Sequence, residues 1–294
     1  MIKVAEIFYS LQGEGMYTGV PSVFLRTFGC NFKCAGFGCP PGKKSKEADQ
    51  IAERINEFDR YEHLPLVSTG CDSYASWHPA FKHLSPKMEI DEIVDKIVDL
   101  LPNKSWRDEH LIITGGEPLL GWQNSFTSLL EHPKMYGLSS ITFETNGTQK
   151  LTSEFANFIH DKCYYGSLSV AKACVPIVFS VSPKLSCSGE SNKDAIKPDV
   201  VCSYEEACRT MHGHGGVVYL KWVVSTEEDV QEALEHTRSY QRRGFKGPVY
   251  LMPCGGTEGP FNLNKQRVAE LALKHGLRYS DRLQVALWKN AWNT

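Results

Sequence analysis

The 294-residue sequence has little net charge and no long apolar run. Its 32 lysines and arginines are balanced by 34 aspartates and glutamates, which leaves a formal charge of −2. Because binding to nucleic acid through its phosphates needs a basic face, we expect no direct nucleic-acid binding. No apolar stretch reaches the roughly 20 residues that span a bilayer, so no membrane segment is expected. The N-terminal MIKVAEIFYSLQGEG lacks the features of a secretory signal, which favours a cytoplasmic protein.

The sequence also lacks internal repeats and low-complexity linkers, so we expect one domain over residues 1–294. Apolar segments typical of strands alternate with helical patterns along most of the chain. The predicted strands are 2–9, 21–26, 110–114, 140–144, 175–180, 217–224, 249–252 and 283–288, and the predicted helices are 45–62, 88–101, 125–131, 153–161, 204–211, 227–242 and 264–275. This alternation predicts an α/β fold, an incomplete (β/α) barrel of about six parallel strands with functional loops at their carboxyl ends.

Ten cysteines are many for such a chain, and in a reducing compartment they favour metal binding or catalysis over disulfides. Cys30 and Cys34 follow a predicted strand in FLRTFGCNFKC. The third partner is either Cys39 or Cys71, which lies beyond a polar insertion at 35–70. Three thiolates would hold an iron–sulfur cluster with one iron left open to a ligand. All four thiolates together would instead close a tetrahedral zinc site, as in a binding module.

The remaining cysteines and histidines carry less information. Cysteines in apolar or helical surroundings usually act as small hydrophobic residues, and we expect this of Cys163, Cys174, Cys202 and Cys208. The glycine-rich context of His212 and His214 is typical of a helix C-terminal loop rather than a metal site.

Polar residues follow several of the predicted strands. After strand 110–114, Gly115, Gly116 and Glu117 form a close backbone approach with a carboxylate, which suits an ammonium group. Arg26 ends an earlier strand and offers a planar fork for a carboxylate. Each such residue alone has an ordinary structural explanation, such as a helix cap or an ion pair. Their succession at one strand end after another favours a binding site.

These motifs resemble the radical S-adenosylmethionine superfamily and, within it, the 7-carboxy-7-deazaguanine synthase family. The opening EIFYSLQGEGMYTGVPSVFLRTFGC is similar to the family's N-terminal signature, and ITGGEPLL to the superfamily's GGE segment. FETNGT and SVSPKLS are similar to the strand ends that contact the cofactor. The block CDSYASW resembles the end of the family's cysteine motif, C-D-T followed by an aromatic. The resemblance therefore implies Cys71 as the third ligand, with Cys39 as the alternative.

The resemblance implies a [4Fe–4S] cluster, S-adenosylmethionine and Mg²⁺ as cofactors. It implies these roles: cluster ligands Cys30, Cys34 and Cys71; Mg²⁺ ligand Ser73; S-adenosylmethionine contacts Phe32, Asp72, Gly115, Gly116, Glu117, Thr145, Ser182 and Lys184; substrate contacts Gln12, Glu14, Gly15, Arg26 and Thr114. Gln284 stands where the family commonly has a histidine in its last strand.

The implied activity is radical conversion of 6-carboxy-5,6,7,8-tetrahydropterin to 7-carboxy-7-deazaguanine with loss of ammonia, a step in queuosine-type biosynthesis. The radical would be a 5′-deoxyadenosyl radical, and the protein would position atoms and exclude water. The implied partners are an electron donor such as flavodoxin and a second copy of the chain in a homodimer. An activase that generates a glycyl radical on a partner protein is the alternative enzyme, because it would share the cluster and the GGE segment.

Overall fold

The computed structural model describes residues 1–165, 175–210 and 213–294. Cys174 and His212, considered above, lie outside these ranges. Within them, the main sheet has nine strands in the order β11-β10-β9-β6-β5-β4-β2-β1-β3. Its strands are β1 (Ile2–Leu11), β2 (Pro21–Thr27), β3 (Lys87–Met88), β4 (His110–Gly115), β5 (Ser140–Thr145), β6 (Ile177–Val181), β9 (Gly216–Val224), β10 (Val249–Pro253) and β11 (Arg278–Tyr279).

The sheet is mostly parallel and is not closed. From β2 to β11 each neighbouring pair runs parallel, whereas β1 pairs with β2 and β3 in antiparallel register. The edge strands β3 and β11 do not pair with each other. The predicted α/β class with a mostly parallel sheet is therefore confirmed. The described residues contain seven mutually parallel strands, where the sequence had indicated about six.

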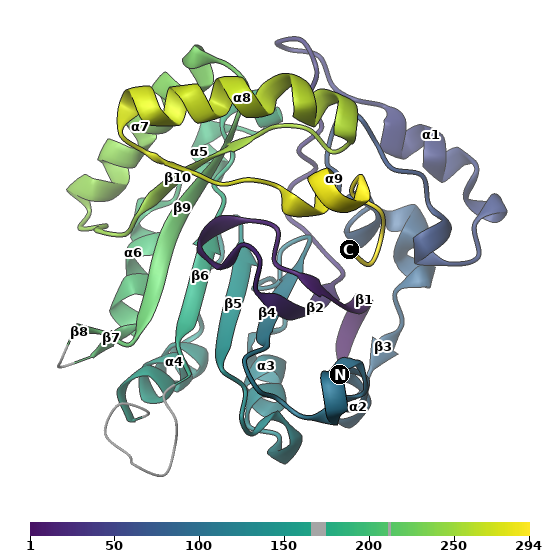
Figure 1. Cartoon of the computed structure of the whole chain (residues 1–294), viewed down its shortest axis with the longest axis vertical. Helices are drawn as coiled ribbons and strands as arrows, with labels where there is room; N and C mark the ends of the chain where they lie inside the picture. The colour runs from purple at the N-terminus through teal and green to yellow at the C-terminus, as the bar shows by residue number, and fades with distance from the viewer. Residues whose placement is uncertain (166–174, 211–212) are drawn as a thin grey trace.

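Helices cover the outer face of the curved sheet, while α9 lies on its inner side (Figure 1). The helices are α1 (Glu47–Glu53), α2 (Ile90–Leu100), α3 (Gln123–Leu130), α4 (Ser153–Tyr165), α5 (Asn192–Ala195), α6 (Pro198–Ala207), α7 (Glu227–Arg242), α8 (Glu258–His275) and α9 (Leu283–Trp288). A short hairpin, β7 (Arg209–Thr210) with β8 (Gly213–His214), forms a second, two-stranded sheet. The helix predicted over 204–211 begins earlier because Pro198 opens α6, a position where its missing N–H costs nothing.

The strand predicted over 283–288 is wrong, because this segment is helix α9. The parallel edge of β10 is taken instead by β11, through Tyr250 and Leu251. Within α9 only Val285 is buried and Leu287 is half exposed, so its apolar residues do not form a sheet face. The contacts that neighbouring polar residues make in the folded chain, rather than the apolar pattern, decide that this segment is a helix.

The core lies between the parallel strands and their outer helices, and it includes Cys163 and Cys208. Residues 35–70, which were predicted to be an insertion, contribute to a separate, smaller core. There the predicted helix 45–62 is only α1 followed by 3₁₀ turns at Ile55–Glu57 and Tyr61–His63. Its apolar side chains pack on Ala5 of β1 and on residues of the 71–84 segment. This segment therefore packs against β1, on the antiparallel side of the sheet.

Candidate active site

A cavity at the carboxyl ends of the parallel strands is lined by residues of α9 and of the cysteine loop, residues 28–39. Figure 1 shows α9 on the inner side of the sheet. All but two of the predicted site residues line the cavity. They are Gln12, Glu14, Arg26, Cys30, Phe32, Cys34, Cys71, Asp72, Ser73, Thr114, Gly115, Gly116, Thr145, Ser182 and Lys184. The exceptions are Gly15, which is half-buried, and Glu117, which is fully buried.

Three thiols occupy one end of the cavity. Cys30, Cys34 and Cys71 pack with Phe32 and Phe37 in a small apolar cluster. Burial raises the pKa of Cys30 to about 12, and the nearby Cys71 adds to this increase. Burial likewise raises the pKa of Cys71 to about 11, and the neighbouring Asp72 adds to it. The pKa of the Cys34 thiol is also raised well above its usual value by burial.

The cysteine loop is held from outside the cavity. Glu190 accepts hydrogen bonds from the backbone N–H groups of Lys33, at 2.9 Å, and Cys34, at 2.7 Å. Cys34 has φ of 48°, a left-handed conformation that needs such support. Cys39 does not line the cavity, and its thiol faces the carbonyl of Ala35 at 3.8 Å. The fold thus places Cys71, rather than Cys39, beside the first two cysteines.

The donor set at this end consists of soft sulfur ligands in an apolar pocket, which suits iron–sulfur ligation. Among residues 1–165, 175–210 and 213–294, no three Cys, His, Asp or Glu side chains form a group that could hold a single metal ion. Cys30, Cys34 and Cys71 nevertheless lie in one apolar cluster, so three thiols are available at this end of the cavity as ligands for a larger group.

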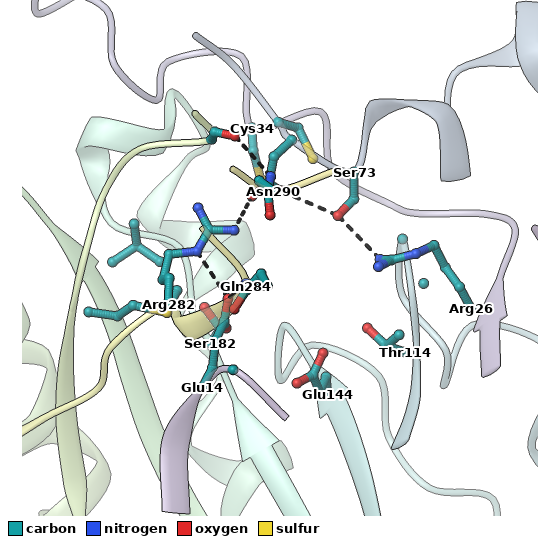
Figure 2. Close-up of a pocket in the computed structure, with 18 of the residues that line it drawn as sticks. Glu14, Arg26, Cys34, Ser73, Thr114, Glu144, Ser182, Arg282, Gln284 and Asn290 are labelled. Carbon is teal, nitrogen blue, oxygen red and sulfur yellow. Dashed lines mark hydrogen bonds and ion pairs between the residues drawn. The ribbon is translucent and has the colours of Figure 1, made fainter. Parts of the chain in front are cut away.

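A charged network forms the other end of the cavity (Figure 2). Glu14 accepts hydrogen bonds from Arg282 Nε at 3.0 Å, from Gln284 Nε2 at 2.8 Å and from Lys221 Nζ. Arg282 also donates from Nη2 to Asp72 Oδ2 at 2.6 Å. Despite burial, these cations hold the pKa of Glu14 far below its usual value. The network is therefore fully ionised at neutral pH.

Arg26 reaches across the cavity from β2 toward Ser73 (Figure 2). Its Nε donates to Glu6 Oε2 at 2.7 Å, and its Nη1 lies 3.4 Å from Ser73 Oγ. Ser73 Oγ also lies 3.3 Å from Asp72 Oδ1. One edge of the guanidinium is thus used by a buried carboxylate, which fixes the direction of the other edge.

Gln12 connects the loop after β1 to the end of β5. Its Nε2 donates to Glu144 Oε1 at 3.1 Å, and its Oε1 accepts from the backbone N–H of Glu14 at 3.1 Å. Gly15 shapes the same loop: its φ is 71°, and a Cβ there would overlap the Tyr219 hydroxyl. In this structure Gly15 therefore permits the turn and its close approach to Tyr219. The predicted substrate contact of Gly15 stays a prediction.

The GGE segment packs directly against the cysteine loop. A Cβ on Gly116 would lie 2.7 Å from Cys30 Cβ, so only glycine permits this approach. The N–H of Glu117 donates to the Gly29 carbonyl at 2.7 Å. The Glu117 carboxyl is fully buried and accepts from Thr145 Oγ1 at 2.8 Å and from the Asn146 N–H at 2.7 Å. In this structure Glu117 joins the ends of β4 and β5 rather than facing the cavity.

Ser182 and Lys184 come after β6 and also line the cavity. Lys184 Nζ donates to Ser182 Oγ at 3.3 Å and lies 6.0 Å from the centre of the Phe37 ring. The Ser182 N–H donates to the Thr145 carbonyl at 2.8 Å. Lys184 thus lies beside the aromatic ring that packs with the three cysteines.

Sequence reasoning missed several residues of the cavity wall. Lys221 and Arg282 hold Glu14, and Glu144 holds Gln12. The segment 290–294 also lines the cavity. Lys221 left a signal in the sequence, because a lysine inside the apolar strand VVYLKWVV needs a buried partner. Nothing comparable marks Arg282 or 290–294, which lie in polar connecting segments.

Comparison with known proteins places this arrangement in a family. No protein-family model matches the chain. A 7-carboxy-7-deazaguanine synthase of Halobacterium salinarum is 30% identical over 308 residues, which cover 100% of this chain and 93% of that protein. The chain belongs to the 7-carboxy-7-deazaguanine synthase family. A second member, from Pyrobaculum aerophilum, is 27% identical over 291 residues, covering 99% of this chain and 96% of its own.

The fold agrees with this membership. The crystal structure of QueE from Escherichia coli superposes with a TM-score of 0.51 at 20% identity, over 95% of this chain and 92% of that one. The family predicted from the sequence motifs is therefore confirmed, and the glycyl-radical activase and the zinc module are not favoured. In the described part of the chain, no helix has the length and apolarity needed to cross a membrane.

Proposed function

We propose that this chain is a radical S-adenosylmethionine lyase that converts 6-carboxy-5,6,7,8-tetrahydropterin to 7-carboxy-7-deazaguanine with release of ammonia. The observation that carries the proposal is the cavity itself, in a chain of this family. It has three thiols at one end, one of them buried and two partly buried, and a fixed, ionised network at the other.

At the first end, Cys30, Cys34 and Cys71 would hold a [4Fe–4S] cluster. When bound, the cluster and S-adenosylmethionine supply one-electron radical chemistry. Gly115 and Gly116 bring their backbone beside Cys30, where their carbonyls can accept hydrogen bonds from the cofactor's ammonium. The other proposed cofactor contacts in the wall are Phe32, Asp72, Thr145, Ser182 and Lys184. Glu117 accepts a hydrogen bond from Thr145 Oγ1 and so holds the Thr145 side chain in the cavity wall.

At the second end, the chain would bind the pterin. A carboxylate has about four acceptor positions, and three of those on Glu14 are taken by Lys221, Arg282 and Gln284. The remaining position can accept from an N–H group of the substrate ring. Because Glu14 stays ionised, it acts as an acceptor only and would orient the ring by its donors.

The free edge of Arg26 is suited to the carboxylate of the substrate, and Ser73 provides an oxygen for Mg²⁺ beside it. Gln12 and Thr114 complete the proposed substrate contacts. The proposal also includes a single domain over residues 1–294 with an insertion at 35–70, a homodimer, and an electron donor such as flavodoxin.

The test is anaerobic turnover of reconstituted protein with the pterin, S-adenosylmethionine, Mg²⁺ and a strong reductant. We expect 7-carboxy-7-deazaguanine and ammonia in equal amounts, detected by chromatography and mass spectrometry. Cleavage of S-adenosylmethionine without any deazaguanine, at full iron content, would overturn the proposed substrate. Addition of EDTA measures the requirement for Mg²⁺ separately.

A further inference from the structure

Several residues that follow α9 have a left-handed backbone conformation. Lys289, Asn290 and Asn293 have φ of 56°, 63° and 64°, which are left-handed conformations. Asparagine tolerates this region, whereas lysine does so at some cost, and the contacts around the segment must offset it. Asn290 supplies one such contact, because its Nδ2 donates to the Gly256 carbonyl at 2.8 Å.

Trp292 supplies the main contact, and it is made with the 35–70 insertion. The indole Nε1 donates to the Leu64 carbonyl at 2.6 Å. The indole ring meets the Tyr61 ring edge-on, with centroids 4.9 Å apart and an interplanar angle of 76°. A second edge contact joins it to Tyr74, at 6.1 Å. The other members of this small core come from β1 and from residues 48–84, so Trp292 joins it from the far end of the chain.

The residues fixed by this contact belong to the cavity. Residues 290–294 line it together with Ser68 and Gly70 of the insertion and its boundary. Glu6 and Arg26 line the same cavity, and the Glu6 carboxylate fixes Arg26 through its 2.7 Å contact. The contact of Trp292 with Leu64 therefore holds residues 290–294 in the wall of the cavity that Arg26 also lines.

We infer that the 35–70 insertion provides the docking pocket for Trp292, and that this docking positions residues 290–294 as the cavity wall beside Arg26. Trp292 is thus a positioning residue for the substrate end of the cavity. Tyr61 and Leu64 are the insertion residues that hold it. The inference rests on the proposed function only in taking this end of the cavity to bind the pterin.

The first test measures docking without any activity. Hydrogen–deuterium exchange of residues 289–294 is compared in the full-length wild type, Trp292→Ala, Tyr61→Leu and the control Trp106→Phe. The control removes an indole hydrogen bond to a backbone carbonyl, that of Lys134, far from the cavity. We expect exchange of 289–294 to rise at least about fivefold in the first two variants, since a contact of this kind is worth about 1 kcal/mol or more. Unchanged exchange in both would overturn the inference.

The second test measures positioning in turnover. Trp292→Phe keeps an aromatic ring but loses the N–H, so we expect the KM for the pterin to rise about fivefold. The kcat and the iron content should stay within about twofold of wild type, and Trp106→Phe should match wild type in all three. The ratio of 5′-deoxyadenosine to deazaguanine should rise in Trp292→Ala. A KM and a ratio equal to wild type in a folded, iron-loaded Trp292→Ala would contradict the positioning role.

The two tests separate the inference from the proposed function. If the wild type cleaves S-adenosylmethionine but makes no deazaguanine, the substrate assignment fails, and the exchange experiment still decides whether Trp292 docks. If deazaguanine forms at an unchanged KM in Trp292→Ala, the substrate assignment stands and the positioning role fails.

Discussion

The cysteine end of the cavity and its charged end are built in opposite ways. At the charged end, Glu14 has Lys221, Arg282 and Gln284 as donors, so its charge is balanced before any ligand arrives. At the cysteine end, burial raises the pKa of Cys30 and Cys71, and Lys184 is the cation that opposes this increase at both thiols. The charged end therefore needs no ligand to balance its charge. The cysteine end suits a positively charged group that takes thiolates as ligands.

This difference predicts which end of the cavity keeps its geometry without a cofactor and which end depends on one. The charged end should keep its geometry with or without the cluster, because its partners are side chains of the fold. The cysteine end should gain order and lose protons when a cluster binds. Variants at the two ends should therefore fail in different ways, and the predictions below run from the largest effect to the smallest.

The largest effect is expected at the third cysteine. In Cys71→Ala we expect loss of the cluster and of all turnover, because two thiolates remain at the site. Cys39→Ala is the matched control and should keep the wild-type iron content, since Cys39 does not line the cavity. Iron and sulfide per chain, with the visible absorption spectrum, measure both. Cluster loss in Cys39→Ala with retention in Cys71→Ala would reverse the assignment.

At the charged end, Glu14→Gln should reduce stability without touching the cysteines. It leaves buried Lys221 without its carboxylate and Arg282 with Asp72 alone, which costs roughly 3–5 kcal/mol in free energy of unfolding. Glu57→Gln is the control, because it breaks an exposed ion pair with Arg54, and exposed ion pairs contribute little to stability. Urea unfolding of the three cluster-free proteins gives the comparison. Equal losses of unfolding free energy in both variants would show that the buried network around Glu14 stabilises the protein no more than an exposed ion pair does.

The same carboxylate predicts a pH dependence. The pKa of Glu14 is far below its usual value in the folded protein and ordinary in the unfolded chain, so below about pH 4.5 the unfolded state binds more protons. The contribution of Glu14 to stability is therefore complete above that pH and is lost as the pH falls. The free energy of unfolding should decline less steeply between pH 5 and pH 3 in Glu14→Gln than in wild type. Parallel declines would contradict the ionised network.

Arg26→Lys should have the smallest effect. Lysine keeps the charge but cannot bond Glu6 and a substrate carboxylate with one planar group. We expect the KM for the pterin to rise about tenfold, equivalent to about 1.4 kcal/mol, with the iron content unchanged. Steady-state kinetics on the reconstituted enzyme measure it. A change in iron content instead of KM would mean that Arg26 supports the cysteine end.

Much of the site could be predicted from the sequence, because its residues lie in short motifs at strand ends. Cys30, Arg26, Gly115 and Thr145 each follow or end an apolar strand, and parallel strands bring their carboxyl ends to one edge. The side on which Glu117 points could not be predicted, since that depends on the packing of β4 against β5.

The sequence by itself determined the mostly parallel α/β architecture and the cysteine motif, because apolar periodicity and residue spacing are local properties. Only the tertiary structure decided that 283–288 is a helix, that Arg282 and Lys221 meet Glu14, and that Trp292 enters the core of the insertion. These contacts join residues more than 200 positions apart. Their energy comes from burial and charge pairing after the chain has folded, and no local pattern records which distant partner will be present.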